Sequence, residues 1–169
     1  MNAVAHRPAH EQVLEWLAAV PDPEIPVLSV VDLGLIRDIA WEDATCVVTI
    51  TPTYSGCPAM QEISADIRAA LLAQGIRQVR IETRLSPAWT TDWMTEKGRK
   101  ALKGYGIAPP AEKAIDFSGI SRQNTAVAVP CPLCGSSHTR VISHFGSTSC
   151  KALYRCHACG EPFDYFKAH

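Results

Sequence analysis

Four cysteines in the last third of the sequence have the types and spacing of a metal site. They form two pairs, each with two intervening residues and a glycine after the second cysteine: Cys131, Cys134, Cys156 and Cys159. Each pair can present two sulfurs to one ion, and two pairs close a tetrahedral four-thiolate site with no open position for a substrate. This spacing predicts a zinc ribbon with one structural zinc ion. Iron held by the same thiolates is the alternative that the spacing leaves open.

A fifth cysteine, Cys57, follows a glycine loop and directly precedes Pro58 and a predicted helix. Proline is favoured in the first turn of a helix, so we expect Cys57 at or near the N-cap. The helix dipole and the free backbone N–H groups lower the pKa of a thiol in that position. A populated thiolate suits metal ligation, cluster transfer or nucleophilic attack. The alternative is that Cys57 only caps the helix.

Polar residues elsewhere could complete a site around Cys57. Asp22 and Glu24 lie on a proline-rich loop, and Thr51 supplies a hydroxyl group before the cysteine. A carboxylate near Cys57 could act as a hard metal ligand or a proton acceptor, whereas the alternative is that both carboxylates are solvated turn residues. No histidine has an obvious position beside Cys57, which gives little support to a Cys–His hydrolase.

The two remaining cysteines have less specific settings. Cys46 alternates with apolar residues of a predicted strand, so we expect it to be packed in the core. Cys150 lies in a turn-rich stretch and reads as a small buried hydrophobe, with a second reactive thiol as the alternative. The single histidines of this region are more typical of surface residues than of substitute ligands: His138, His144, His157 and His169.

The elements that must position these residues follow from hydrophobic periodicity and from proline and glycine. We expect helices at 8–20, 57–74 and 91–103, a short helix at 29–34, and strands at 35–41, 45–51 and 76–85. In the last strand Val79, Ile81, Thr83 and Leu85 should alternate inward. This order predicts a small α/β (α+β) sandwich, a mixed sheet of three or more strands with helices on one face.

Turn formers mark the boundaries of two parts. We expect the α/β domain over 1–104, a linker over 105–125, and an all-β zinc ribbon over 126–169. The ribbon has few large apolar residues, so much of its folding free energy should come from the metal.

Composition narrows the classes of function. The chain has 169 residues, 47% of them hydrophobic, with a formal net charge of −1. No apolar run has the length of a membrane helix and no export signal is visible, so we expect a cytoplasmic protein that does not bind membranes. From residue 126 onward four Lys/Arg face two Asp/Glu, a weak electrostatic basis for nucleic-acid binding. The oligomeric state is left open, a homodimer included.

Two stretches, residues 22–36 and 51–60, resemble the metal–sulfur cluster biosynthesis domain of the SufT/PaaD-like family. The resemblance covers roughly residues 8–104. It implies a small α/β sandwich associated with iron–sulfur protein maturation, with the reactive cysteine of the family at Cys57 and its acidic-loop motif at Asp22 and Glu24. A transient iron–sulfur cluster at Cys57 is part of that expectation.

Four further stretches, 89–96, 105–110, 145–156 and 161–166, resemble the branch of that family found in bacterial phenylacetate degradation. The resemblance implies an accessory or maturation role for the multicomponent phenylacetyl-CoA epoxidase. Partners would be epoxidase subunits or the iron–sulfur assembly machinery. The alternatives are a non-catalytic interaction subunit of the oxygenase complex and a thiol enzyme using Cys57. The sequence departs from this branch at Ala168, near which we expect a cysteine. Either His169 or Cys150 compensates, or the feature is absent in this chain.

Overall fold

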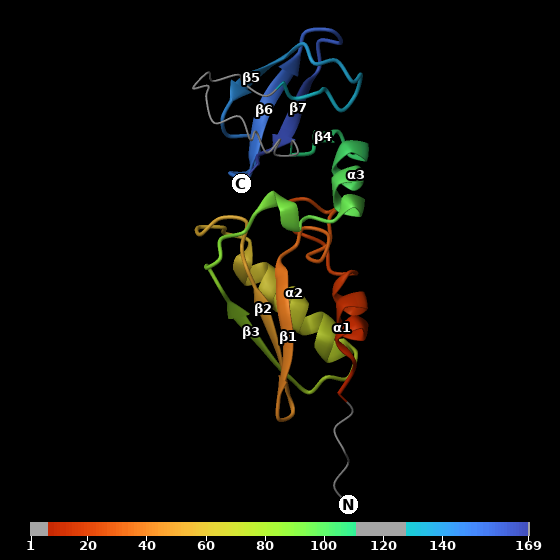
Figure 1. Cartoon of the computed structure of the whole chain (residues 1–169), viewed down its shortest axis with the longest axis vertical. Coiled ribbons are helices and arrows are strands. Elements are labelled where there is room, and N and C mark those ends of the chain that lie inside the picture. Colours follow the sequence, from red (N-terminus) through yellow and green to blue (C-terminus); the bar gives the residue numbers. More distant parts are fainter. Residues whose placement is uncertain (1–6, 111–127, 169) are drawn as a thin grey trace, which may run out of the picture. The chain divides into compact units, whose positions relative to one another are not determined.

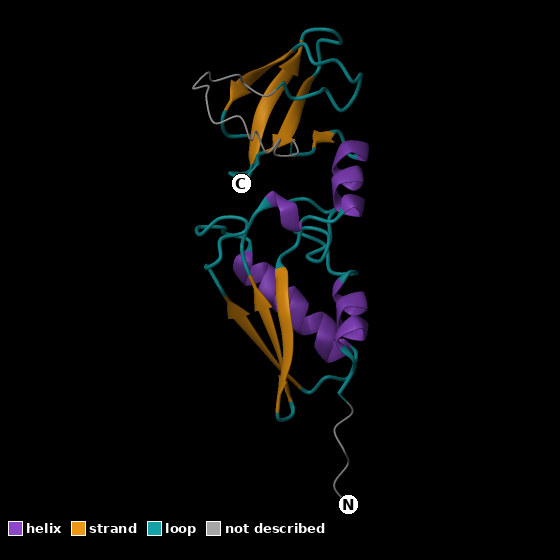
Figure 2. Cartoon of the chain, viewed as in Figure 1, coloured by secondary structure: helices purple, strands orange, loops and turns teal. Residues whose placement is uncertain are grey.

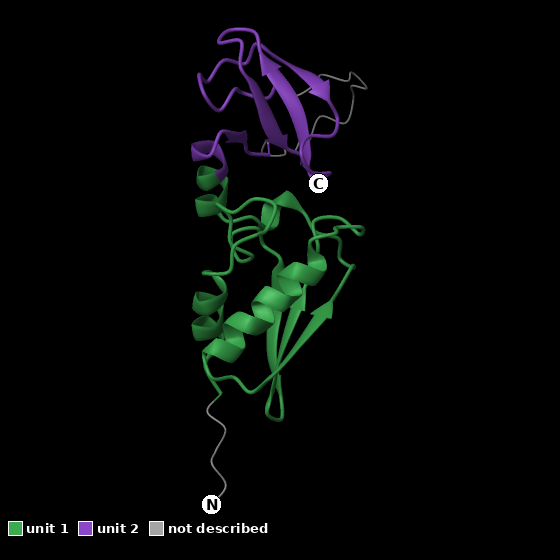
Figure 3. Cartoon of the chain, turned by 180° about the vertical axis from the view of Figure 1, so that it is seen from behind, with its two compact units in different colours: residues 1–101, 169 green, residues 102–168 purple. Residues whose placement is uncertain are grey.

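The structure is a computed structural model that describes residues 7–110 and 128–168. Figure 1 labels the elements along the chain, and Figure 2 shows that helices lie in the N-terminal part whereas the C-terminal part is built of strands and loops. The chain divides into two compact units, residues 1–101 with 169 and residues 102–168 (Figure 3). Of the predicted linker, residues 111–125 lie outside the described residues.

The first unit contains a three-stranded sheet in the order β1-β2-β3. β1 (Ile36–Glu42) and β2 (Thr45–Ile50) form an antiparallel hairpin, and β3 (Gln78–Thr83) pairs with β2 in parallel. The hairpin turns at Asp43, whose positive φ of 49° is a conformation that Asp tolerates better than most residues. β2 is rich in β-branched residues and is buried along almost its whole length, since it is the central strand. The predicted mixed sheet is confirmed.

Helices cover one face of this sheet. α1 (His10–Leu17) ends before Pro21, and α2 (Met60–Ala73) connects β2 to β3 and lies across the sheet in Figure 3. The buried stripe of α2 consists of Ile63, Ile67 and Leu71, spaced for a single helical face. Because two parallel strands flank α2, the loops that follow β2 and β3 lie at the same end of the sheet.

The segment between α1 and β1 contributes much of the core although it contains no helix. The short helix expected at 29–34 is absent; turns replace it, and Leu28, Val30 and Leu33 are each at most 3% exposed. Gly34 has φ +73°, and a Cβ there would collide with the backbone carbonyl of Trp93. Glycine is therefore needed at this point of close approach.

Three further local predictions were wrong. The helix expected from Cys57 begins at Met60, and the helix expected at 91–103 is split into a 3₁₀ turn, η1 (Thr91–Trp93), and α3 (Glu96–Gly104). Thr95 separates these two pieces because its hydroxyl accepts the N–H of Gly98 at 2.9 Å, which starts a new helix. Leu85 is 57% exposed rather than inward, since β3 ends at Thr83.

The second unit is a four-stranded sheet in the order β4-β7-β6-β5. It comprises β4 (Ile107–Ala108), β5 (Thr139–Ser143), β6 (Lys151–Cys156) and β7 (Pro162–Phe166). β4 lies within the stretch predicted to be a linker, yet it pairs in parallel with β7. A cluster of five buried residues lies in this unit, and two of them are cysteines. The cluster consists of Ala108, Val129, Cys131, Cys156 and Phe163.

Candidate functional site

The two cysteine pairs of the second unit fold into two turns with the same backbone geometry. In the first knuckle, the Gly135 N–H donates to the carbonyl of Cys131 at 2.9 Å; in the second, the Gly160 N–H donates to the carbonyl of Cys156 at 3.0 Å. Both glycines have positive φ, +78° and +80°, which a residue with a side chain rarely adopts. The glycine after each pair therefore lets the chain turn sharply enough for both thiols to point inward.

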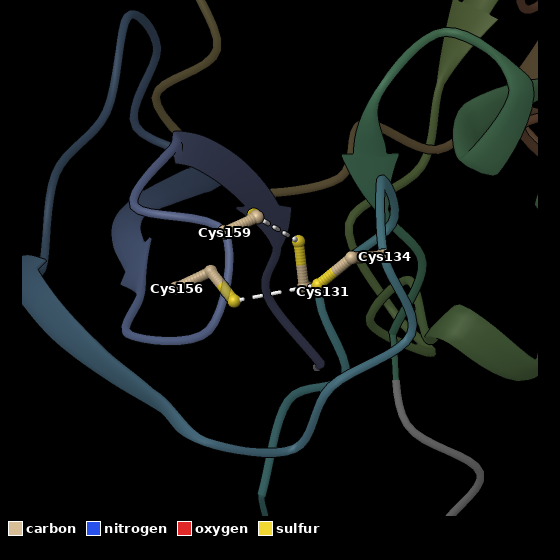
Figure 4. A group of neighbouring side chains, drawn as sticks. All are labelled: Cys131, Cys134, Cys156 and Cys159. Atoms are coloured by element: carbon tan, nitrogen blue, oxygen red, sulfur yellow. Dashed lines mark hydrogen bonds between the residues drawn. The ribbon is translucent and has the colours of Figure 1, made fainter.

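The four sulfurs converge on one point (Figure 4). They all lie within 4.8 Å of one another. The Sγ atoms of Cys131 and Cys159 are 3.8 Å apart, and those of Cys134 and Cys156 are 3.6 Å apart. A tetrahedral ion with Zn–S bonds of about 2.3 Å needs sulfurs about 3.8 Å apart. The donor set and its spacing fit a structural zinc ion.

The second knuckle favours a thiolate at Cys156, whereas desolvation and the neighbouring sulfurs raise the pKa of the Cys159 thiol to about 12. The N–H groups of Cys159 and Ala158 lower the pKa of the Cys156 thiol to about 7. Cys131 and Cys156 are buried, whereas Cys134 and Cys159 are exposed. The site thus combines two thiols in the core with two at the surface. A metal ion that binds them displaces the protons of the four thiols.

Cys150 does not belong to this group. It is 3% exposed, and the Oγ1 of Thr148 lies 3.0 Å from its sulfur. Within the described residues, the metal-ligand cluster consists of the four knuckle cysteines alone. Cys150 is therefore not a ligand of the four-cysteine site, and His169 lies outside the described residues.

In the first unit, Cys57 lies in a turn between β2 and α2. Its N–H donates to the carbonyl of Tyr54 at 3.2 Å, and its own carbonyl accepts the N–H of Met60 at 3.4 Å. The N-cap of α2 is Ala59, so Cys57 is not the cap of the helix. Cys57 therefore precedes the helix, and its half-buried thiol accepts the N–H of Ala59.

The pKa of the Cys57 thiol is raised, which contradicts the expected lowering by the helix dipole. Burial is the main cause, and the carboxylates of Glu24 and Asp22 raise the pKa further. The N–H of Ala59 and a hydrogen bond with Tyr54 act in the opposite direction but do not prevail. α2 begins three residues after Cys57, whereas a helix dipole acts mainly within the terminal turn.

The acidic loop is therefore close enough to Cys57 to raise the pKa of its thiol, but the two carboxylates of the loop differ. Asp22 is 5% exposed, and its Oδ1 accepts the N–H groups of Glu24 and Ile25 at 2.9 and 2.8 Å. It is a buried residue that shapes its own loop, so the interpretation as a solvated turn carboxylate was wrong for Asp22. Glu24 is half-buried.

Thr51 is 2% exposed and lines a cavity of about 390 Å³ at the end of the sheet where β2 and β3 finish. Tyr54, Leu85 and Trp89 line it as well. Trp89 was missed in the sequence: it is 4% exposed, and its Nε1 donates to the carbonyl of Leu33 at 3.0 Å. Since that contact spans 56 residues, no local pattern could have revealed it.

A second residue that the spacing did not single out is Asp32. Its carboxylate accepts the hydroxyls of Ser29 at 2.8 Å and Thr95 at 2.9 Å, and its backbone carbonyl accepts the N–H of Thr95 at 2.9 Å. Burial opposes ionisation, but these hydrogen bonds and Lys97 hold the pKa of Asp32 below its ordinary value. Asp32 thus ties the 20–35 segment to the start of α3.

The electrostatics around Cys57 favour binding of a cation over thiolate chemistry. Two carboxylates that raise the pKa of a thiol make a free thiolate rarer at neutral pH, which disfavours a nucleophile. The same carboxylates attract a metal ion, and a metal ion displaces the thiol proton. The set of Cys57, Glu24 and Asp22 therefore favours a bound cation over a free thiolate.

Comparison with known proteins agrees with this division of the chain. Residues 10–82 match the model of an iron–sulfur cluster assembly protein, and residues 118–167 match the PaaD zinc beta ribbon domain. Within the described residues, no helix has the length and apolarity needed to cross a bilayer.

Relatives cover either the whole chain or its first unit. The chain is 47% identical to a putative 1,2-phenylacetyl-CoA epoxidase subunit of Escherichia coli, over 95% of this chain and 93% of that protein. It is 38% identical to an Fe-S protein maturation auxiliary factor of Porphyromonas gingivalis, over 54% of this chain and 89% of that one.

A solved structure shares the fold of the first unit. The crystal structure of a domain of unknown function (DUF59) from Bacillus anthracis superposes with a TM-score of 0.51 at 29% identity, covering 54% of this chain and 89% of that one. The ribbon matches the PaaD model, and the full-length relative spans both units. The chain therefore belongs to the family of iron–sulfur cluster assembly proteins that carry a PaaD-type zinc ribbon.

Proposed function

We propose that this chain is an accessory maturation protein of a phenylacetyl-CoA epoxidase, and that it assists assembly of an iron or iron–sulfur centre through Cys57. The observation that carries the proposal is the half-buried Cys57 thiol under the influence of the Asp22 and Glu24 carboxylates. A thiolate flanked by hard oxygen ligands can hold an iron ion loosely enough to release it. The metal is cargo here, and the zinc of the ribbon is structural.

We place this role in the reducing cytoplasm, where disulfides are rare. All seven cysteines are free thiols in the structure, which fits that compartment. Partners would be the epoxidase subunits or the iron–sulfur assembly machinery. A homodimer remains compatible with this role.

The test compares wild type with Cys57→Ser, both prepared without oxygen and reconstituted with iron and sulfide. We expect about one zinc in both proteins and iron, with or without acid-labile sulfide, only in wild type. Cys46→Ala is the matched control, since Cys46 is a buried thiol of β2 and should leave iron binding unchanged. Equal iron in Cys57→Ser and wild type would refute the role of Cys57.

Glu24→Gln separates the carboxylate from the thiol. It removes a charge near Cys57 but leaves the hydrogen bonds that the Glu24 N–H and the Ile25 N–H donate to Asp22. We expect weaker iron binding with unchanged stability. Unchanged iron binding would show that the acidic loop plays no part in holding the metal.

An interaction subunit without metal chemistry is the second candidate, favoured by the similarity along the whole chain to a putative epoxidase subunit. The two functions differ in what Cys57→Ser does to an epoxidase assay. A maturation protein loses client activation while it still binds the client, whereas an interaction subunit keeps both.

A further inference from the structure

Two arginines lie directly opposite each other in the ribbon sheet. Arg140 of β5 pairs with Arg155 of β6, and both side chains are exposed. The adjacent positions on the same face hold His138 and His157, which are also exposed and whose rings are 4.8 Å apart. We call these four residues the basic face. Like charges directly opposite in a sheet are destabilising, so the arrangement needs a counterpart.

The ribbon does not supply that counterpart. Among the described residues, neither Arg140 nor Arg155 forms an ion pair with a carboxylate. The Nε of Arg155 donates to the carbonyl of Gly160 at 3.3 Å, which leaves its two terminal nitrogens for other partners.

The other cations of the ribbon are already engaged. The side chain of Lys151 is 6% exposed and lies 3.6 Å from the Asp164 carboxylate. The Nζ of Lys167 lies 4.8 Å from the ring centre of Phe145. Within residues 128–168, the positive charge that has neither a carboxylate nor an aromatic ring beside it is therefore concentrated on the basic face.

Compensation of the thiolate charge is the first alternative. Four thiolates around Zn²⁺ carry a net charge of −2, and Arg155 precedes Cys156 in sequence. However, successive residues of a strand point to opposite faces of a sheet. Cys156 shares its face with Thr139, its cross-strand partner, so both arginines lie on the face away from the Cys156 sulfur.

Exposed apolar residues also lie along the edge strand of the sheet and in the turn that follows it. β5 is an edge strand, and Val141, Ile142 and Phe145 are 40%, 50% and 68% exposed. Arginine beside exposed aromatic and aliphatic side chains is the composition of protein interfaces. Nucleic acid fits less well, because two arginines can neutralise few phosphates, whereas typical binders contact six to ten.

We propose that the basic face and the adjoining apolar edge of β5 form the docking surface for an acidic protein segment, whose carboxylates are held by the forks of Arg140 and Arg155. This deepens the proposed function, on which it rests, by assigning client docking to the ribbon. Guanidinium forks bind carboxylates with two parallel hydrogen bonds. The apolar edge would add the desolvated contacts that such ion pairs need.

The test measures binding of the full chain to the purified oxygenase component of a phenylacetyl-CoA epoxidase at several salt concentrations. Arg140→Glu/Arg155→Glu should raise the Kd roughly tenfold or more, and the wild-type Kd should rise with salt concentration. The matched control is Arg68→Glu/Arg77→Glu, which changes the net charge equally at exposed positions of the first unit. It should stay within about twofold of wild type.

Zinc content verifies that the ribbon is folded in each variant. If Arg140→Glu/Arg155→Glu lacks zinc, the single variant Arg140→Gln tests the docking surface instead, because it leaves Arg155, the residue before Cys156, unchanged. Arg140→Gln should still weaken binding several-fold. The proposal is overturned by wild-type affinity in the arginine variants, by equal losses in the Arg68/Arg77 control, or by an oxygenase component that does not bind wild type. Failure of the Cys57 function shows separately, as full client activation by Cys57→Ser with normal docking.

Discussion

Removal of zinc should unfold the second unit and leave the first intact. Among the described residues of the ribbon unit, few large apolar side chains are buried: Leu102, Ile107, Val129, Phe163 and Phe166. Each contributes about 1.5–3 kcal/mol when fully buried, so together they supply about 10 kcal/mol. A structural zinc ion in a small module contributes about 10–16 kcal/mol. The metal term is thus at least as large as the apolar term, and the unit should not fold without it.

The two units can be observed separately. All four tryptophans lie in the first unit: Trp16, Trp41, Trp89 and Trp93. Tryptophan emission therefore reports on the first unit only, while dispersed amide resonances of residues 128–168 report on the ribbon. A strong chelator should abolish the chemical-shift dispersion of the ribbon amide resonances. It should also remove one zinc ion per chain, as measured with an indicator dye. The tryptophan emission should not change.

Substitution of one ligand should act like the chelator. Cys134→Ser removes an exposed sulfur without emptying the core, whereas Cys150→Ser changes a cysteine of the same unit that lies outside the metal cluster. We expect the first variant to lose its zinc and the second to retain it. Dispersed ribbon resonances in fully demetallated protein would refute the reasoning, because the apolar side chains would then suffice.

Three further predictions concern the first unit. Alkylation of Cys57 by iodoacetamide should be slower at neutral pH than that of a free thiol and should accelerate only as pH rises through its raised pKa, with Cys57→Ser as the blank; fast labelling at neutral pH would contradict this. Asp32→Asn should lower the free energy of unfolding in urea by about 1.5–3 kcal/mol. Because the pKa of Asp32 is lowered in the folded protein, the stabilisation from the ionised carboxylate is present above the unfolded pKa and is lost as pH falls through the folded pKa. A difference between wild type and variant that persists in acid would refute this prediction. Gly34→Ala should be far more destabilising than Gly75→Ala, since both have positive φ but only Gly34 lies against the Trp93 backbone; Gly75→Ala should cost about 1–2 kcal/mol, and equal melting points would refute the difference.

Local patterns predicted the parts of the molecule that depend on local geometry. The knuckles follow from spacing within five residues, and the structure brings Cys131, Cys134, Cys156 and Cys159 together. The buried face of α2 consists of Ile63, Ile67 and Leu71, and a 3.6-residue period of this kind can be read within one segment.

The predictions that failed depend on contacts between distant segments. The pKa of Cys57 is raised by burial and by carboxylates some thirty-five residues earlier in the chain, so a rule based on its helix alone gave the wrong sign. Likewise, Trp89 is held by Leu33. No periodicity within either segment encodes that pairing.

The place of Cys57 in the family motif stays a prediction, although the acidic loop and the thiol lie close enough to interact. Only the family resemblance predicted that the acidic loop lies near Cys57, since Asp22 and Cys57 are far apart in the sequence and no local pattern connects them. Composition also concealed the basic face, because the ribbon as a whole has a small charge excess. The arrangement became visible only once the pairing of Arg140 with Arg155 was known.

The pairing of β4 with β7 has a practical consequence for anyone who divides this chain into fragments. A fragment beginning at residue 126 would contain all four zinc ligands and would look complete by motif. It would nevertheless lack Ile107 and Ala108, so β7 would lose its neighbour and the core around Phe163 would lose Ala108. An unpaired strand edge invites association with other chains. Expression trials of the isolated ribbon should therefore begin at residue 102, where the second unit starts.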